Sequence, residues 1–187
     1  GSPPQPSGGP AWGYPFRVNK NLPLNAADFE VREVPFDDPR GEAIRGAMNA
    51  EMSERYADSF DELTPEQVVL AEVALSVDPS AVITTIMAFA PDGTPAAHVL
   101  LRDHHGEWEV KRVITAQAYR GTGVGSRVMR AAHEYAAARG AERMVLQCGD
   151  RQPEAVGMYT KLGYLEIPVY EPYKSGLPRS RCFAKAL

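Results

Sequence analysis

Three alternating glycines, at positions 121, 123 and 125, stand in the stretch TAQAYRGTGVGS of residues 115–126. They fall between a predicted strand and a predicted helix, where glycine lets the backbone approach a ligand closely. The first amides of a helix have no partner within the helix, and together with the helix dipole they favour phosphate. A turn without a ligand would lose backbone entropy at three glycines for no gain in packing. The stretch therefore indicates a phosphate-binding loop.

The spacing of these glycines excludes two common nucleotide loops. A P-loop requires Gly-x4-Gly-Lys-Ser/Thr, and no lysine follows the glycines here. A dinucleotide fingerprint requires Gly-x-Gly-x-x-Gly after a strand of a parallel βαβ unit. The chain instead has Gly-x-Gly-x-Gly, after a strand that belongs to a predicted hairpin meander.

Two motifs resemble those of a known family. Residues 120–125, RGTGVG, resemble the Arg/Gln-x-x-Gly-x-Gly/Ala signature of the GNAT superfamily of N-acetyltransferases. Residues 152–164, QPEAVGMYTKLGY, resemble that family's second cofactor motif, Asn-x-x-Ala-x-x-x-Tyr-x-x-x-Gly-Phe/Tyr. Residues 109–115, EVKRVIT, are similar to its fourth strand. The resemblance covers residues 107–166 closely and extends, through the order of elements, from about residue 28 to the C-terminus.

The resemblance implies that the chain binds acetyl-CoA as a co-substrate. Loop amides hold the pyrophosphate in this family, a role that falls here on Arg120, Gly121, Thr122, Gly123, Val124, Gly125 and Ser126. The end of the fourth strand pairs with pantetheine like an added strand, which implicates Val113, Ile114 and Thr115, and a bulge commonly splays the central strands there. The usual Asn of the second motif is Gln152, whose amide sits one methylene farther out.

Two residues are candidates for the chemistry of acetyl transfer. An alkylamine has a pKa of about 10.4, so removing its proton at neutral pH costs about 4 kcal/mol and a base is useful. Several family members place a base on the fourth strand, where this chain has Glu109; a carboxylate cross-strand from a basic residue is the alternative. Tyr159 matches the tyrosine that protonates the CoA sulfur in many members. We expect its hydroxyl to donate a hydrogen bond to the sulfur and to transfer its proton late in the reaction, aided by a lowered pKa. The alternative is that Tyr159 is a core residue, and one residue can have both roles.

The acceptor is expected to be a primary amine, attacking acetyl-CoA directly in a ternary complex, and a small molecule is favoured. The first two helices wall the acceptor site in the family. Their acidic residues would attract a cation, although solvated helix faces look the same: Glu42, Glu51, Glu54, Asp58, Asp61, Glu62 and Glu66. The candidate substrate-binding residues are Glu51, Arg55, Tyr56 and, in the loop before the last strand, Tyr173.

Two other functions stay open at this stage. A protein or peptide N-acetyltransferase would need an open groove between the first helices and the loop before the last strand. A non-catalytic acyl-CoA-binding module would keep the glycine loop and lose the acid, and the retained Tyr159 speaks against it.

The elements that position these residues follow from alternation, helical periodicity and caps. Strands are predicted at residues 29–34, 81–89, 96–102, 107–115, 143–148, 164–167 and 181–187, and helices at 39–56, 65–76, 123–139 and 153–162. The order is strand, two helices, three strands, helix, strand, helix and two strands. It predicts an α/β fold with a mixed sheet, GNAT-like, with splayed central strands. We expect one domain over residues 28–187, after a Pro/Gly-rich N-terminal tail over residues 1–27.

Composition bounds the remaining possibilities. A length of 187 residues suits one domain with a sizeable core, and 44% apolar with 24% charged residues is ordinary for a soluble protein. A net charge of −4 argues against nucleic-acid binding. Residues 1–101 carry 6 basic and 15 acidic side chains and residues 102–187 carry 14 and 9, which fits an amine-facing and a phosphate-facing half.

Several further expectations concern location and partners. No run approaches the roughly 18 apolar residues of a membrane span, and the chain starts without the features of a secretory signal. Gly1 and Ser2 resemble the remnant of a removed tag. Only Cys148 and Cys182 occur, so no disulfide framework is expected and a cytoplasmic location is favoured. The histidines lack the spacing of metal ligands, so we expect no metal. A homodimer is a further possibility that the sequence leaves open.

Overall fold

A seven-stranded sheet forms the centre of the computed structural model, which describes residues 23–187. The strands are β1 (Glu30–Val34), β2 (Val82–Phe89), β3 (Pro95–His104), β4 (Glu107–Thr115), β5 (Arg143–Cys148), β6 (Leu165–Ile167) and β7 (Arg181–Ala186). Their order across the sheet is β1-β2-β3-β4-β5-β7-β6. Every neighbouring pair is antiparallel except β4 and β5, which are parallel. The predicted mixed sheet is therefore confirmed.

Six α-helices and three short 3-10 turns join these strands in the described part of the chain. The helices are α1 (Pro39–Arg55), α2 (Ala57–Phe60), α3 (Pro65–Leu75), α4 (Val124–Ala137), α5 (Pro153–Lys161) and α6 (Tyr173–Gly176). The 3-10 turns are η1 (Ala26–Asp28), η2 (Pro79–Ala81) and η3 (Gln117–Tyr119). Each predicted strand and helix is present, with ends that differ by at most two residues. The four-residue helices α2 and α6 were not predicted, because one turn is too short to show a periodic pattern.

The predicted helix starts are confirmed in atomic detail. The carboxylate of Asp38 accepts a hydrogen bond from the Arg40 amide at 2.9 Å, with Pro39 at the first helical position. Thr64 and Gln67 exchange side-chain and backbone hydrogen bonds in a capping box that opens α3. These caps fix where α1 and α3 begin, and both helices stand over one face of the sheet.

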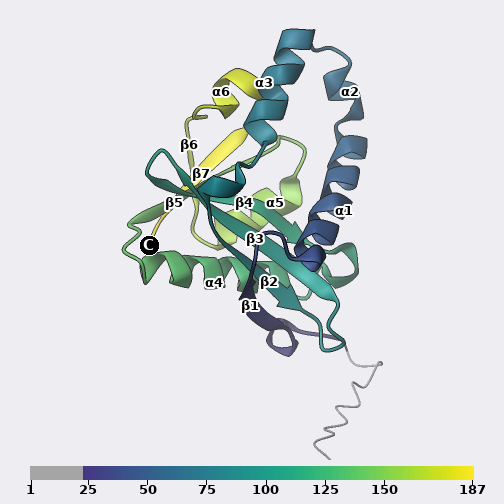
Figure 1. Cartoon of the computed structure of the whole chain (residues 1–187), viewed down its shortest axis with the longest axis vertical. Helices are drawn as coiled ribbons and strands as arrows, with labels where there is room; N and C mark the ends of the chain where they lie inside the picture. The colour runs from purple at the N-terminus through teal and green to yellow at the C-terminus, as the bar shows by residue number, and fades with distance from the viewer. Residues whose placement is uncertain (1–22) are drawn as a thin grey trace, which may run out of the picture.

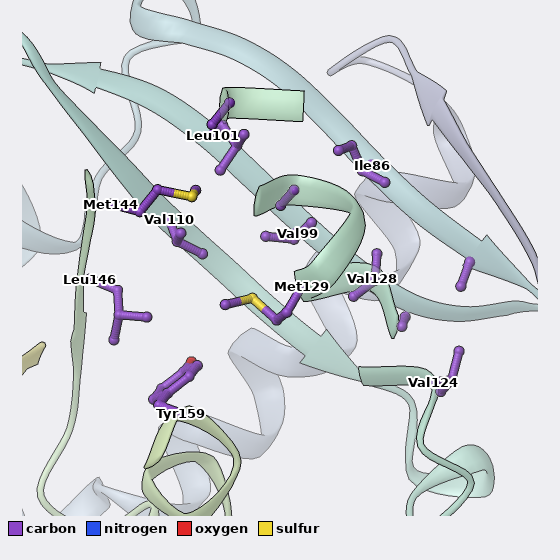
Figure 2. Packing of buried hydrophobic residues seen from close by; sticks show 14 of the residues in the cluster. Ile86, Val99, Leu101, Val110, Val124, Val128, Met129, Met144, Leu146 and Tyr159 are labelled. Atoms are coloured by element: carbon purple, nitrogen blue, oxygen red, sulfur yellow. The ribbon is translucent and has the colours of Figure 1, made fainter. Parts of the chain in front are cut away.

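The two faces of the sheet are covered by different helices (Figure 1). On one face, α4 and α5 pack on the main core, where Val128 and Met129 of α4 meet Val99 and Val110 of the sheet (Figure 2). On the other face, α1 covers a smaller cluster and α3 packs with α6. The glycine loop leads into α4 on the first face, whereas the helices that were expected to wall the acceptor site stand over the second.

The N-terminal boundary and membrane contact can be addressed only within residues 23–187. The predicted tail, residues 1–27, lies mostly outside this range; its residue Leu24 packs against the main core. No helix in the described range combines the length and the hydropathy that crossing a membrane requires.

Candidate functional site

The central strands β4 and β5 separate at one end of the sheet. Their pairing is confined to Trp108–Val110 against Met144–Leu146, so β4 continues beyond Val110 without this neighbour. The register of β3 against β4 shifts at the same place, where Val99 stands opposite two residues, Arg112 and Val113. Arg112 has φ of 54°, in the left-handed region. This is a β-bulge, which bends a strand and ends its regular pairing; the expected splay of the central strands is confirmed.

A buried histidine braces the bulge. The Nδ1–H of His98 donates to the Arg112 carbonyl oxygen at 2.7 Å, and Nε2 accepts from the Arg45 guanidinium at 3.0 Å. This pattern requires a neutral ring with its proton on Nδ1. Burial lowers the pKa of His98 to about 4, in keeping with the neutral form. His98 thus connects α1 to the bulge through hydrogen bonds rather than through charge.

Beyond the bulge, β4 presents an open edge toward the gap. The Ala116 amide donates to the Ala96 carbonyl on β3 at 2.8 Å. Because backbone groups of successive strand residues point to opposite edges, those of Ile114 also face β3, while those of Val113 and Thr115 face the gap. An extended amide-containing ligand can pair with this edge as an added strand. These are the residues that were expected to hold pantetheine.

The glycine loop leads from this edge into α4. Gly121 and Gly123 have φ of 81° and 83°, which glycine adopts without strain. Gly123 is the N-cap of α4, and no side chain caps the helix. Within the described chain, the amides of Gly121, Gly123, Gly125 and Ser126 donate to no other group. Four free amides at the start of a 14-residue helix are suited to an anion such as a pyrophosphate.

Gly125 lets the helix start lie against the end of β4. A Cβ atom at this position would stand 2.5 Å from Thr115 Oγ1 and 3.4 Å from Met158 Sδ. Any side chain here would therefore push the loop away from the strand edge. The free amides of the glycine loop and the edge of β4 thus form one continuous backbone surface, which fits the CoA moiety that the resemblance implies.

A cavity of about 620 Å³ opens beside this surface, between α1–α3, the splayed strands and the segment from α6 to β7. Of the residues predicted to bind cofactor or substrate, five line it: Tyr56, Val113, Gln152, Tyr159 and Tyr173. Apolar side chains form much of the wall, from Met48 and Met52 on α1 to Leu75 on α3. Tyr56 also supports the turn after β5, because its hydroxyl accepts from the Arg151 amide at 2.9 Å.

Two of the predicted substrate-binding residues take part in ion pairs instead of lining the cavity. Glu51 pairs with Arg55 at 3.1 Å and with Arg120 of the glycine loop at 2.7 Å. Arg55 also pairs with Glu154 at the start of α5. Of the seven acidic residues on the first helices, only Glu62 lines the cavity. The wall also contains Asp150 and the cations Lys111, Arg112 and Arg179, so it is mixed in charge.

Tyr159 lies between α5 and the main core, with its ring beside Leu146 in Figure 2. It is 4% exposed, and its ring packs at a tilt against Tyr164 and Phe183, with ring centroids 5.8 Å and 6.1 Å away. Its hydroxyl has no hydrogen-bond partner among the described residues, although the residue lines the cavity. Burial raises its pKa above the usual range. This direction is opposite to the lowered pKa expected from the sequence, because the apolar surroundings disfavour the phenolate.

Glu109 is fully buried and does not line the cavity. Its carboxylate accepts from Arg102 Nε at 2.6 Å, from the Tyr170 hydroxyl at 2.7 Å and from the Tyr173 hydroxyl at 3.1 Å. Arg102 is the residue opposite on β3. Three donors enclose the carboxylate, and Tyr173 lies between it and the cavity. Glu109 therefore has no direct path to a bound amine.

Lys111 lies two residues along the same strand and does line the cavity. Its Nζ donates to the Tyr173 hydroxyl at 3.1 Å and to the Ala74 carbonyl at 3.3 Å. The residue is 8% exposed, and burial, with the nearby Arg102, lowers its pKa to about 7. Burial therefore favours the neutral amine more than in an exposed lysine.

Neither Lys111 nor the position of the bulge at Arg112 was predicted from the sequence. A signal was present for the first, since Glu109 and Lys111 stand two residues apart in a predicted strand and must share a face. Nothing in the sequence marked the position of the bulge, because Arg112 is not a residue type that favours positive φ.

Metal-ligating and thiol groups add little to this site. Among residues 23–187, no three His, Cys, Asp or Glu side chains gather as a metal ion would require. Cys148 and Cys182 are both free and buried. Cys148 lines the cavity, and burial raises its pKa to about 12, which keeps the thiol protonated.

Comparisons with known proteins agree with this architecture. A 58-residue stretch is 38% identical to the uncharacterized N-acetyltransferase YobR of Bacillus subtilis (strain 168), covering 31% of this chain and 24% of that relative. The chain thus spans about a quarter of the length of this curated relative.

Solved structures share the fold. A protein assigned as an acyl-CoA N-acyltransferase in Klebsiella pneumoniae subsp. pneumoniae MGH 78578 superposes with a TM-score of 0.67 and 22% identity, over 86% of this chain and 99% of that chain. A GNAT family acetyltransferase from Elizabethkingia anophelis, with acetyl-CoA bound, superposes with a TM-score of 0.60 and 12% identity, over 86% and 99%. At these identities the likeness concerns the fold alone. A model of the acetyltransferase (GNAT) family matches residues 44–164, which is more than half of the sequence, and the chain belongs to that family.

Proposed function

We propose that this protein transfers the acetyl group of acetyl-CoA to the primary amine of a small molecule, by direct attack in a ternary complex. The observation that carries the choice of a small acceptor is the closure of the cavity between α3 and α6. A Cβ atom on Gly176 would stand 2.5 Å from the Leu70 carbonyl oxygen, so the two helices touch through their backbones. A protein substrate would need a groove where this contact lies.

The backbone surface supports acetyl-CoA as the donor. The free amides from Gly121 to Ser126 would hold the pyrophosphate, and the open edge at Val113 and Thr115 would pair with pantetheine. Gln152 lines the same cavity and can offer its amide to the pantetheine arm. Together they would direct the thioester toward the cavity that Tyr159 lines.

Tyr159 is proposed to assist the departing thiolate. Its hydroxyl is unpartnered within the described chain and faces the cavity, so it can donate to the CoA sulfur. Because burial raises the pKa of the phenol, hydrogen-bond donation is favoured in the ground state, and proton transfer follows only as charge develops on sulfur. The sequence-predicted base, Glu109, could act only through the Tyr173 hydroxyl.

The proposal is tested by measuring acetyl-CoA binding and thiol release. Calorimetry should detect acetyl-CoA or CoA binding, and no heat at millimolar concentration would show the proposal to be wrong. Thiol release should then be measured across a panel of small amines, aminoglycosides and peptides. Turnover confined to peptides would favour a protein acetyltransferase instead.

The role of Tyr159 is tested separately. Tyr159→Phe should lower turnover about 100-fold or more while leaving the affinity for CoA within about threefold of the wild type. If turnover and CoA affinity fall equally, Tyr159 does not act at the sulfur. If the wild type binds acetyl-CoA but turns over no member of the panel, an acyl-CoA-binding module is favoured.

A further inference from the structure

The buried polar cluster beneath the cavity has two members that reach the cavity wall. Arg102, Glu109, Lys111, Tyr170 and Tyr173 form this cluster, and of these only Lys111 and Tyr173 line the cavity. Tyr173 has a single proton, which it donates to Glu109 while accepting from Lys111. The hydrogen bonds therefore run from Lys111 to Tyr173 to Glu109, and the Lys111 amine is the first donor of this series.

The charge of this cluster changes by the titration of one group. Glu109 and Arg102 form an ion pair at 2.6 Å in which both side chains are almost entirely enclosed, at 0% and 10% exposure. This pair is neutral as a unit, so a proton on Lys111 leaves one uncompensated positive charge in a buried place. Such a charge is disfavoured unless a counter-charge accompanies it. The structure thus holds the amine of Lys111 ready to gain or lose a proton.

The groups that act on the charge of Lys111 come from several elements, and Glu62, Asp150, Cys148 and Arg179 line the same cavity. Arg112 on its own strand and Arg102 on β3 lower its pKa, Glu109 raises it, and burial makes the largest contribution. The segment of α6 adds the hydroxyls of Tyr173 and Tyr170, and α3 contributes only the Ala74 carbonyl. No carboxylate pairs directly with Nζ, so nothing in the described chain fixes the amine in its charged form.

We propose that Lys111 is the general base that deprotonates the acceptor amine, with Tyr173 and Glu109 as positioning residues that hold it. The inference rests on the acetyltransferase function proposed above. An incoming ammonium loses a proton to the neutral Nζ of Lys111 and becomes a nucleophile. Its nitrogen then bonds to the thioester carbon as the C–S bond breaks. The second nitrogen proton goes to Tyr159 as Tyr159 gives its own to sulfur, and Lys111 later returns its proton to solvent. The products are the amide, the free thiol and one released proton.

Two variants test the base in the full-length protein. Lys111→Met keeps the length of the side chain without a titrating group, and Lys111→Arg keeps the charge but cannot release a proton at neutral pH. Both should lower kcat about 100-fold or more, while the Kd for acetyl-CoA stays within twofold. If either variant retains more than a third of the wild-type kcat, Lys111 is not the base.

The pH profile separates a base from a merely structural lysine. Wild-type kcat should rise through pH 7 and level off above about pH 8, whereas the residual kcat of Lys111→Met should keep rising through pH 9. With a second acceptor whose amine has a lower pKa, the rise in wild-type kcat should occur at the same pH. If the rise follows the acceptor instead, the titrating group belongs to the substrate and the proposal is overturned.

A third measurement needs no acceptor and distinguishes failure of this inference from failure of the proposed function. Cyanate carbamoylates neutral amines, and mass spectrometry can compare Lys111 with Lys161, Lys174 and Lys185 in the same sample. The ratio of labelling at Lys111 to labelling at the other three should fall at least 30-fold from pH 7.5 to pH 10. A constant ratio would overturn the inference whatever the enzyme acetylates. A falling ratio without thiol release from any amine would overturn the base role together with the proposed function.

Discussion

The two sides of the splayed strands offer different kinds of group to a ligand. On the side of α4, the available groups are backbone amides and a strand edge, from Val113 to Ser126. On the side of α1, α3 and α6, they are side chains drawn from distant parts of the chain, among them Tyr56, Lys111 and Tyr173. A backbone surface suits a donor that is always the same molecule, whereas a side-chain surface can be changed residue by residue for different acceptors.

The same difference appears in how each side is stabilised. The α4 side depends on close backbone approach at Gly125 and on an apolar core. The side of α1, α3 and α6, which we propose to hold the acceptor and call the acceptor side, encloses a lysine, an arginine and a glutamate, which cost free energy to bury. We therefore expect changes on the α4 side to weaken binding, and some changes on the acceptor side to increase stability while activity falls.

Lys111→Met should give the largest change in stability. Replacing a buried cation by an apolar side chain of similar length should raise the free energy of unfolding by about 3 kcal/mol at pH 6. The folded-state pKa of about 7 lies below the unfolded value near 10.4, so the unfolded chain binds more protons between these pH values. Wild-type stability therefore rises with pH across this window, and the advantage of the variant should vanish near pH 10.5.

Urea unfolding at pH 6, 8 and 10 measures this advantage. Lys161→Met, at the exposed end of α5, is the matched control and should change stability by less than about 0.5 kcal/mol at each pH. An advantage that is independent of pH would show that packing, and not the buried charge, stabilises the variant.

Gly125→Val should give the largest loss on the α4 side. A Cβ here would stand 2.5 Å from Thr115 Oγ1, so the loop must move away from the strand edge. We expect the affinity for CoA to fall at least 100-fold, about 2.7 kcal/mol. Calorimetry measures the affinity, and Gly157→Val, at an exposed position of α5 with nothing within 4 Å, is the control. An unchanged Kd in Gly125→Val would mean that the loop does not contact the cofactor.

The contrast between the two sides also explains what the sequence could predict. Glycines at 121, 123 and 125 leave a local pattern, because the backbone conformation of a phosphate loop depends on residues that are adjacent in sequence. Every strand and long helix was likewise predicted from local periodicity and caps such as Asp38 and Thr64.

The acceptor side leaves no such local pattern. Glu109 was predicted as a base from its strand alone, yet whether its carboxylate reaches the cavity depends on Tyr170 and Tyr173, some sixty residues away. The acidic residues of the first helices were expected to face the acceptor, but Glu51 and Asp58 pair with Arg120 and Arg151 of other elements. Both cases depend on contacts between side chains that are far apart in the sequence. A single sequence contains no spacing pattern that predicts such contacts.

Gly176→Ala should have an intermediate effect, confined to the acceptor side. The added methyl group would stand 2.5 Å from the Leu70 carbonyl oxygen and 2.9 Å from its carbon, and backbone atoms cannot rotate away. Separating α6 from α3 should lower the free energy of unfolding by about 2 kcal/mol and raise KM for the acceptor. The Kd for CoA should stay within twofold, because the contact is remote from the glycine loop.

Chemical denaturation and steady-state kinetics check this prediction. Gly46→Ala, at an exposed position of α1 with nothing within 4 Å, should instead stabilise the protein by about 0.5 kcal/mol. If Gly176→Ala weakens CoA binding as much as acceptor binding, the two sides do not act independently.

Glu51→Gln should give the smallest effect, and it tests the ion pair that connects α1 to the glycine loop. Glu51 of α1 holds Arg120 of the glycine loop at 2.7 Å, and Arg120 Nε also donates to the Thr115 carbonyl at 3.3 Å. The pair is half-exposed, so its loss should change stability by less than about 1 kcal/mol. Because the variant frees the guanidinium and removes a carboxylate near the proposed phosphate site, CoA should bind about two- to fivefold more tightly at low salt.

Calorimetry at 20 mM and 500 mM salt tests whether this gain in CoA affinity is electrostatic. The gain should disappear at the higher salt concentration, because the Debye length is then shorter than the separation between the charges. Glu54→Gln removes the same charge from the same helix, at an exposed residue without an ion pair in the described chain, and should leave the affinity unchanged. If Glu51→Gln, but not Glu54→Gln, binds CoA more weakly than the wild type, Glu51 has the opposite role. Glu51 would then position Arg120 for the phosphate instead of competing with it, and the acceptor side would contribute a side chain to cofactor binding.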